Sequence, residues 1–136
     1  MSALLSKIIA IIMFAVSIIM PLNEGGVKAE INVSEEENQV ISVFWTNETN
    51  KAIDELRFSV EKQENGEWTT VEFCDNFGFR EIYTRYYPTE SGTIRINCED
   101  TFGKNLPKGQ YRLILYYHLI LSDKTSDMSA TEFEII

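Results

Sequence analysis

Apolar side chains recur at every second position in one segment after another of residues 30–136, and this period of two constrains the fold more than any other feature. In the longest such segment, the side chains of Tyr111, Leu113 and Leu115 alternate with those of their neighbours. An alternation of this kind gathers one set of side chains on one face of a β-strand, whereas a helix needs a period of 3.6. No stretch keeps a helical stripe over three turns. The pattern therefore predicts an all-β domain.

Seven segments carry the strand pattern, and turn-forming residues separate them. Asn65-Gly66 is the strongest hairpin signal, because its two residues accept the positive φ that a tight two-residue turn needs. Seven short strands at this spacing favour a β-sandwich over other small architectures. The predicted strands cover residues 30–34, 40–45, 56–61, 68–73, 93–97, 111–120 and 130–136.

Residues 1–29 are interpreted as a secretory signal peptide that precedes the fold. Ile8–Leu22 is an unbroken apolar run of the length of a signal core, and a polar stretch follows it. Val27-Lys28-Ala29 then offers small or β-branched residues at the two positions that a signal peptidase reads. The exported domain is therefore expected to cover residues 30–136, with no membrane span after cleavage. The alternative is an uncleaved anchor, since Ala3–Leu22 just reaches the ~20 residues that a span needs.

Export changes the expectation for the cysteines. In an oxidising compartment, Cys74 and Cys98 are expected to form one intramolecular disulfide. The alternative is two buried thiols without a bond.

The charge balance limits the partners. Acidic side chains outnumber basic ones by 21 to 12, for a formal net charge of −9. Nucleic-acid affinity is built from Lys and Arg contacts to phosphates, so a nucleic-acid partner is not expected.

Catalytic and metal-binding patterns are weak. His118 is the only histidine and is interpreted as an ordinary surface or strand-edge residue. Neither cysteine lies in a motif that pairs it with a base. Glu35-Glu36-Glu37 lacks the alternating ligands and central glycine of a calcium loop. We therefore expect no enzymatic activity, no cofactor and no metal site.

Gly109 and Tyr111 form a more specific signal, a glycine two residues before a tyrosine that opens the longest strand. This is the sequence form of a tyrosine corner, in which the phenol hydroxyl bonds back to the backbone a few residues upstream. In an antibody-type domain, an inter-sheet cysteine would follow two residues later, where this chain has Leu113. The sheets are therefore expected to be joined there by packing alone.

The hairpin and the corner together resemble a known family. The Lys-x-x-Asn-Gly-x-Trp hairpin at Lys62–Trp68 and the corner at Gly103–Arg112 are similar to those of bacterial immunoglobulin-like domains, which occur in secreted and surface proteins of Gram-positive bacteria. The resemblance covers most of Val40–Ile120 and implies a seven-stranded immunoglobulin-like β-sandwich. The chain departs from the family pattern in two ways. It has one extra residue between Gly103 and Leu106, and its two cysteines are not a feature of the family. The family implies no catalytic or ligand residues for this chain. The residues expected to have structural roles are Trp68, Gly109 and Tyr111.

The segment between the hairpin and the next strand combines five aromatic and two arginine side chains. Both types are enriched where proteins bind proteins, and aromatic rings also stack on sugars, so we expect a binding surface here. The alternative is that Phe77, Phe79 and Tyr83 close one end of the sandwich. The candidate binding residues are Phe77, Phe79, Arg80, Tyr83, Arg85, Tyr86 and Tyr87.

Two functions fit these observations. The preferred one is a non-catalytic, secreted or surface-associated module that binds a protein or a glycan at the cell surface. The alternative is a secreted proteinase inhibitor with an immunoglobulin-like fold, which would insert a rigid loop into a protease cleft. The turns at Thr46–Ala52 and Ser122–Met128 are the candidate loops for that role.

Overall fold

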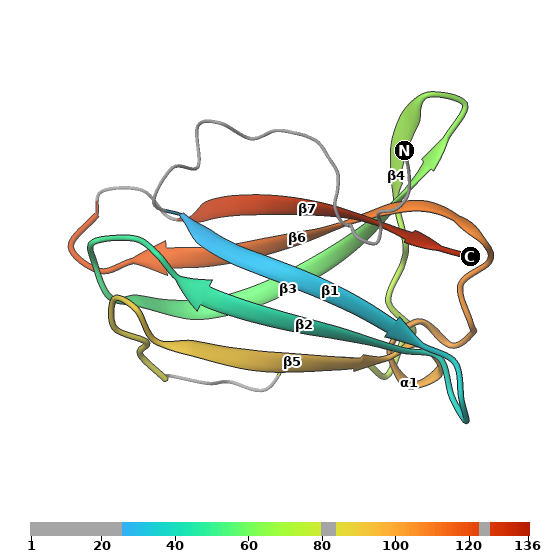
Figure 1. Cartoon of the computed structure of the whole chain (residues 1–136), viewed down its shortest axis with the longest axis horizontal. Helices are drawn as coiled ribbons and strands as arrows, with labels where there is room; N and C mark the ends of the chain where they lie inside the picture. The colour runs from blue at the N-terminus through green and yellow to red at the C-terminus, as the bar shows by residue number, and fades with distance from the viewer. Residues whose placement is uncertain (1–25, 80–83, 123–125) are drawn as a thin grey trace.

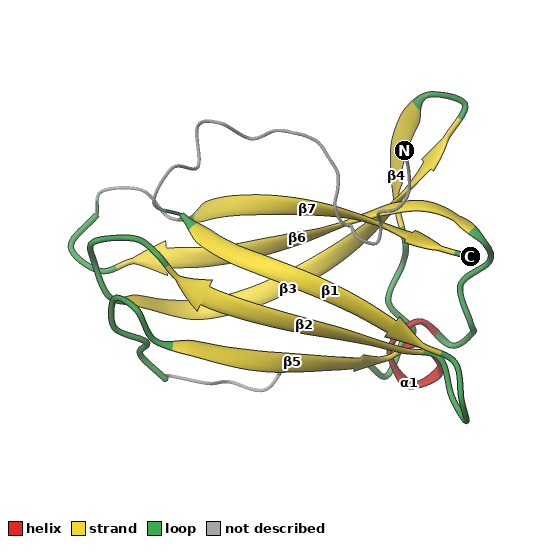
Figure 2. Ribbon diagram, viewed as in Figure 1, coloured by secondary structure: helices red, strands yellow, loops and turns green. Residues whose placement is uncertain are grey.

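A computed structural model describes residues 26–79, 84–122 and 126–136 as a sandwich of two sheets with one short helix (Figures 1 and 2). All seven predicted strands are present, in the predicted order. They are β1 (Val27–Ser34), β2 (Val40–Asn47), β3 (Ile53–Glu64), β4 (Glu67–Thr70), β5 (Ser91–Asn97), β6 (Gly109–Leu119) and β7 (Asp127–Ile135), with helix α1 (Cys98–Phe102) after β5.

One layer has the strand order β1-β2-β5 and the other has the order β4-β3-β6-β7. Every pair of neighbouring strands is antiparallel. The hairpin between β3 and β4 contains Asn65 and Gly66 with φ angles of 53° and 82°. Both angles are positive, as the predicted tight turn requires. The predicted all-β sandwich and its hairpin are therefore confirmed.

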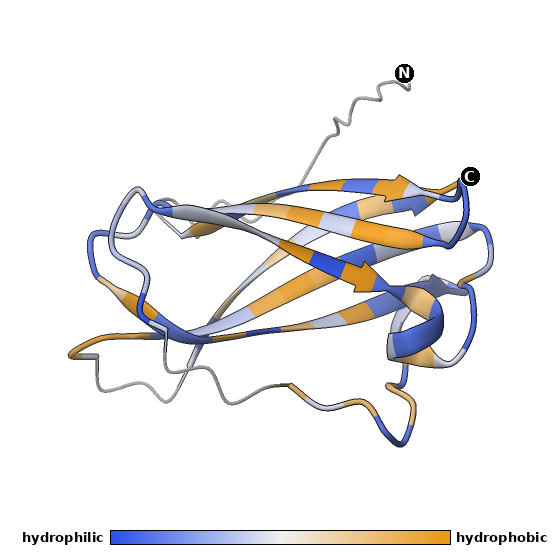
Figure 3. Cartoon of the chain, turned by 90° about the horizontal axis from the view of Figure 1, so that it is seen from below, coloured by the Kyte–Doolittle hydropathy of each residue, from blue (hydrophilic) through white to orange (hydrophobic). Residues whose placement is uncertain are grey.

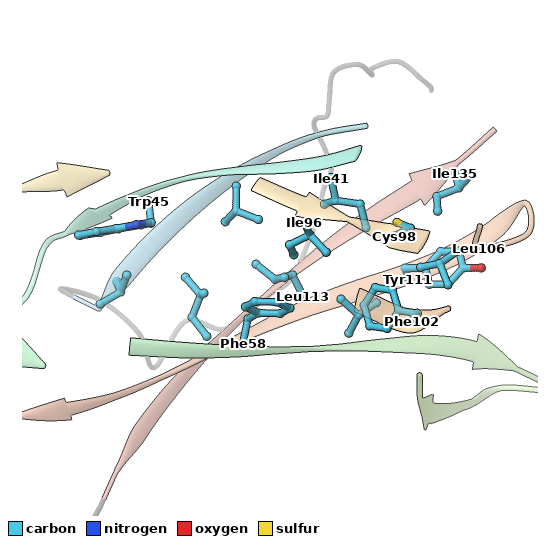
Figure 4. Packing of buried hydrophobic residues seen from close by; sticks show 14 of the residues in the cluster. Ile41, Trp45, Phe58, Ile96, Cys98, Phe102, Leu106, Tyr111, Leu113 and Ile135 are labelled. Carbon is cyan, nitrogen blue, oxygen red and sulfur yellow. The ribbon is translucent and has the colours of Figure 1, made fainter. Parts of the chain in front are cut away.

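The core lies between the layers and is made of alternate residues of the strands. Along β6, the side chains of Tyr111, Leu113, Leu115 and Tyr117 are all buried, as the period of two predicts. Figure 3 shows the resulting alternation of apolar and polar bands along the strands. Burying a large apolar side chain stabilises the fold by about 1.5–3 kcal/mol. The opposite layer contributes Ile41, Val43, Trp45 and Ile96 (Figure 4).

The predicted tyrosine corner is confirmed. The hydroxyl of Tyr111 donates to the carbonyl of Pro107, four residues upstream, at 2.5 Å. The ring is fully buried, and this burial raises the pKa of Tyr111 to about 12. Gly109 has a φ of 152°, a conformation that residues with a Cβ rarely adopt. The glycine and the tyrosine therefore set the path of the chain into β6.

The buried side chain of Gln39 fixes the same end of the sandwich. Its Nε2 donates to the carbonyl of Leu106 at 3.0 Å, and its Oε1 accepts from the amide of Leu106 at 2.6 Å. Phe102 of α1 is buried beside them. We call this region, Gln39 with residues 98–111, the corner end.

Trp68, the third residue with an expected structural role, lies on the outer face of the four-stranded sheet. The guanidinium carbon of Arg112 lies 4.5 Å from the centre of its ring. Arg112 also forms an ion pair with Glu61 at 2.6 Å. The tryptophan thus contributes to a cross-strand cluster on β4, β3 and β6 and is not part of the core.

The predicted disulfide is wrong, because both cysteines are free. Cys98 begins α1 with its thiol in the core beside Ile41 (Figure 4), and burial raises its pKa to about 11. Cys74 lies outside the core, where its amide donates to the carbonyl of Thr101 and its thiol donates to the side-chain oxygen of Asn76. The two thiols therefore lie in different environments and are not close enough to bond.

β1 begins at Val27, three residues before the predicted start of the domain. Val27 is 1% exposed, pairs with Asn47, and accepts a 2.7 Å hydrogen bond from Ser129 Oγ on its carbonyl. Cleavage after Ala29 would therefore remove the first three residues of the strand. The apolar run at Ile8–Leu22 lies outside the described residues. Within the described ranges, no helix is long and apolar enough to cross a membrane.

Candidate functional site

Three turns meet at the end of the sandwich opposite the corner end (Figure 1). We call this region, residues 48–52, 84–90 and 120–122, the loop end. Ile53 and Tyr86 exchange two backbone hydrogen bonds of 2.8 Å, and the amide of Ile120 donates to the carbonyl of Ala52 at 2.9 Å. The start of β3 therefore lies between the other two segments and holds both in register.

A buried asparagine connects the turns of the loop end. The side-chain nitrogen of Asn47 donates to the carbonyls of Lys51 and Tyr86, at 3.0 and 3.2 Å. Its side-chain oxygen accepts from the amide and the hydroxyl of Thr49, at 3.0 and 2.6 Å. Its backbone carbonyl accepts from the amide of Thr89. Because every polar group of the side chain has a partner, Asn47 fixes the backbone of two turns at once.

Tyr86, one of the candidate binding residues, packs into this frame. Its half-buried ring meets Trp45 edge to face, with ring centres 4.6 Å apart. Gly92 lies opposite Trp45 in β5, where a Cβ would come within 2.7 Å of the indole. The indole therefore lies flat over the glycine, and Tyr86 covers its edge.

The first half of the aromatic segment covers the side of the core. Phe77 and Phe79 are half-buried, with ring centres 6.2 and 5.0 Å from that of Phe58 in β3. Phe73 stacks on Phe77 at 4.8 Å and on Phe102 of α1 at 5.8 Å. These rings therefore cover the core beside β3, and Phe73 connects them to Phe102 of the corner end.

The second half of the segment reaches the surface at the loop end. Arg85 is exposed, and the side chain of Tyr87 is 55% exposed. The amide of Tyr87 donates to the carboxylate of Glu90 at 2.7 Å, so its backbone is fixed. Arg80 and Tyr83 lie outside the described residues. Among the candidates that the structure describes, Arg85 and Tyr87 are the exposed ones.

Leu121 is a third exposed side chain of the loop end, and sequence reasoning missed it. It is 91% exposed and has a φ of 69°. It continues the alternation of Tyr111 to Leu119, so the pattern places it inside. The positive φ ends that alternation and turns the side chain towards solvent. Left-handed backbone disfavours a leucine by about 1–2 kcal/mol, so this position combines backbone strain with an exposed apolar group.

A polar group that sequence reasoning also missed lies at the same end of the four-stranded sheet. His118 Nδ1 lies 2.9 Å from a carboxylate oxygen of Asp54, its direct cross-strand partner. Glu55 brings a second carboxylate to the pair. The interpretation of His118 as an ordinary surface or strand-edge residue did not include this contact, which only the pairing of β3 with β6 creates.

Comparison with known proteins connects this fold to a family. The family described as bacterial Ig-like domain matches residues 23–133. A comparison with curated protein sequences finds no match. Domains of this family are typically non-catalytic and often belong to surface or secreted proteins. Because the match extends from before β1 into β7, this chain belongs to the bacterial immunoglobulin-like domain family.

Proposed function

We propose that this domain is a secreted or surface-associated binding module that captures a protein through its loop end. One observation carries the proposal: Tyr87 and Leu121 are exposed apolar side chains on turns whose backbones are fixed by hydrogen bonds. A fixed backbone lowers the entropy lost on binding, and aromatic and arginine side chains concentrate the energy of protein interfaces.

The proposal assigns different roles to the two halves of the aromatic segment. Arg85 and Tyr87 contact the partner together with Leu121. Phe77, Phe79 and Tyr86 hold the segment against the core, as their ring contacts support. A protein is favoured over a glycan, because Leu121 has no ring on which a sugar could stack.

Export is part of the proposal. The apolar run at Ile8–Leu22 serves as the core of a signal peptide, in keeping with the frequent occurrence of this family in exported proteins. A mature chain that keeps β1 whole begins at or before Val27. The mature protein then reaches its partner outside the cell or on its surface.

Capture by matched variants tests the proposal. The immobilised wild-type protein and a Tyr87→Ala, Leu121→Ser variant are incubated with culture supernatant and cell-wall extracts. The control is a Phe44→Ala, Ile136→Ser variant, which also loses one exposed aromatic and one exposed aliphatic side chain, both outside the loop end. We expect the wild type and the control to capture the same protein and the loop-end variant to lose it, with circular dichroism unchanged.

The other outcomes are equally specific. Equal capture by both variants would exclude the loop end as the binding site. Retention of wall glycans in place of a protein would show that the ligand class is wrong. Stoichiometric inhibition of a secreted protease would favour the inhibitor function, because residues 48–52 of the turn Thr46–Ala52 considered for it belong to this end, whereas part of the turn Ser122–Met128 lies outside the described residues.

A further inference from the structure

We propose that Asp54, Glu55 and His118 bind a divalent transition-metal ion of the zinc type on the outer face of the four-stranded sheet. The three side chains can each present one ligand atom, and these atoms lie within 4.8 Å of one another. This proposal is independent of partner capture at the loop end, because it rests on a different set of side chains.

The strands bring the ligands together in two ways. Asp54 of β3 and His118 of β6 are directly opposite in the register, so their side chains share one face. Glu55 follows Asp54, and in a regular strand its side chain would point to the other face. The register shifts between Asp54 and Arg57, and Glu55 has a φ of 53° within this irregular stretch. A bulge of this kind changes the direction of a side chain, and here it leaves both carboxylates within reach of the imidazole.

The ligand types select the class of ion. An imidazole nitrogen suits Zn²⁺, Ni²⁺ and Cu²⁺, whereas Ca²⁺ and Mg²⁺ favour sites built from oxygen ligands alone. Bonds of about 2.0–2.2 Å around a tetrahedral Zn²⁺ place neighbouring ligand atoms about 3.4 Å apart. The present spacing reaches that arrangement through small side-chain rotations. Two carboxylates also balance the charge of a divalent ion, and the fourth position stays open to water.

A simple hydrogen bond between Asp54 and His118 explains only part of this group. Their side chains are 20% and 29% exposed, so the pair is partly shielded from solvent. The carboxylate of Glu55, however, makes no hydrogen bond or ion pair with any residue in the described part of the chain. The carboxylate of Glu55 is exposed, so it can turn towards an ion held by Asp54 and His118 without giving up a protein contact.

The chain offers a direct spectroscopic test, because His118 is its only histidine. Zn²⁺ is titrated into the purified protein while the imidazole resonances are followed by NMR and the heat is followed by calorimetry. We expect a 1:1 complex that shifts the histidine signals. Loss of one ligand should weaken binding by about tenfold or more, so Asp54→Asn, Glu55→Gln and His118→Asn are compared. Glu134→Gln is the matched control, since it removes an exposed carboxylate elsewhere on the same sheet.

Four results would overturn the proposal. Zn²⁺ could leave the histidine signals unchanged. Glu134→Gln could weaken binding as much as Glu55→Gln, which would indicate unspecific attraction to an acidic protein. Cys74→Ser could abolish the binding, which would assign the ion to the accessible thiol. Excess Mg²⁺ should not compete with Zn²⁺, and displacement by Mg²⁺ would contradict the role of the imidazole. Glu55→Gln leaves the Asp54–His118 pair intact, so it provides a test even if another variant unfolds.

Discussion

The corner end and the loop end close the same sandwich in different ways. At the corner end, large side chains such as Tyr111, Leu106 and Phe102 fold inward and are buried. At the loop end, the side chain of Asn47 fixes two turns and the carbonyl of Ala52 holds the third, while Tyr87 and Leu121 face solvent. The difference shows that a turn held through its backbone leaves its own side chains free. The first arrangement contributes stability, and the second presents a contact surface on a rigid frame.

The largest expected effect concerns the strand start beside the loop end. A chain beginning at Glu30 lacks Val27, which is buried, lies opposite Asn47 in the pairing of β1 with β2, and accepts a hydrogen bond from Ser129. Compared with a chain beginning at Gly26, we expect a loss of about 3–5 kcal/mol in the free energy of unfolding. Urea denaturation of the two chains measures it. A difference below about 1 kcal/mol would show that Val27–Ala29 is dispensable, as cleavage after Ala29 requires.

Asn47→Ala tests whether one side chain fixes the loop end. The substitution removes four hydrogen bonds of a buried side chain, two to the carbonyls of Lys51 and Tyr86 and two from Thr49, so we expect a loss of about 3 kcal/mol. Asn32→Ala, an exposed amide on β1, is the control and should change stability by less than about 0.5 kcal/mol. Hydrogen exchange should accelerate at residues 48–52 and 86–90 and stay unchanged at the corner end. Uniform acceleration throughout the domain would argue against a local role.

Tyr111→Phe is the matching change at the corner end. It keeps the packing of the ring and removes the donor to Pro107, so the expected loss is roughly 1–3 kcal/mol. Thermal or urea denaturation measures it. A change under about 0.3 kcal/mol would mean that this hydrogen bond contributes nothing to the corner.

The order of the strands could be predicted because each strand buries one face, and a period of two records this in the sequence. The starts of β1 and β3 could not. β3 begins before Leu56, since the bulge at Glu55 interrupts the alternation. Val27-Lys28-Ala29 fits both a strand and a cleavage motif, so the sequence alone cannot distinguish them. Helix α1 has only five residues, which is too short to show a helical period.

The exposure of individual side chains was harder to predict, because it depends on tertiary pairing. Tyr86 and Tyr87 are neighbours of the same type, and only the backbone pairing of Tyr86 with Ile53 decides which ring covers Trp45. The sequence spacing of the two cysteines likewise does not show whether each side chain points into the core or away from it. Cys98 faces the core from the start of α1, while Cys74 lies outside it.

Alkaline pH should destabilise the domain, in part through two buried groups of the corner end. Burial raises the pKa of Cys98 from 9.0 to about 11 and that of Tyr111 from 10.0 to about 12. The folded state therefore holds both protons more tightly, and stability falls as pH rises above the unfolded values of 9.0 and 10.0. In Cys98→Ala the fall should begin about one pH unit later, because the buried tyrosines whose pKa values are raised, Tyr111 and Tyr117, start from an unfolded value of 10.0 and not 9.0. Melting temperatures measured against pH decide this, and an unchanged onset in the variant would exclude Cys98 as the cause.

The smallest expected effect is a gain in stability, from a substitution of Leu121. It tests whether stability and partner binding at the loop end change independently. Leu121→Asn places a residue that tolerates left-handed backbone at a φ of 69°, so we expect a gain of about 0.5–1 kcal/mol in the free energy of unfolding. The same change removes an exposed apolar contact, so capture of the partner should weaken. Ile136→Asn, at the exposed C-terminal residue, should alter neither property. If the domain is stabilised and capture is retained, the strain at Leu121 has no part in binding. If both results hold, a strained leucine is kept at this turn for the contact it makes.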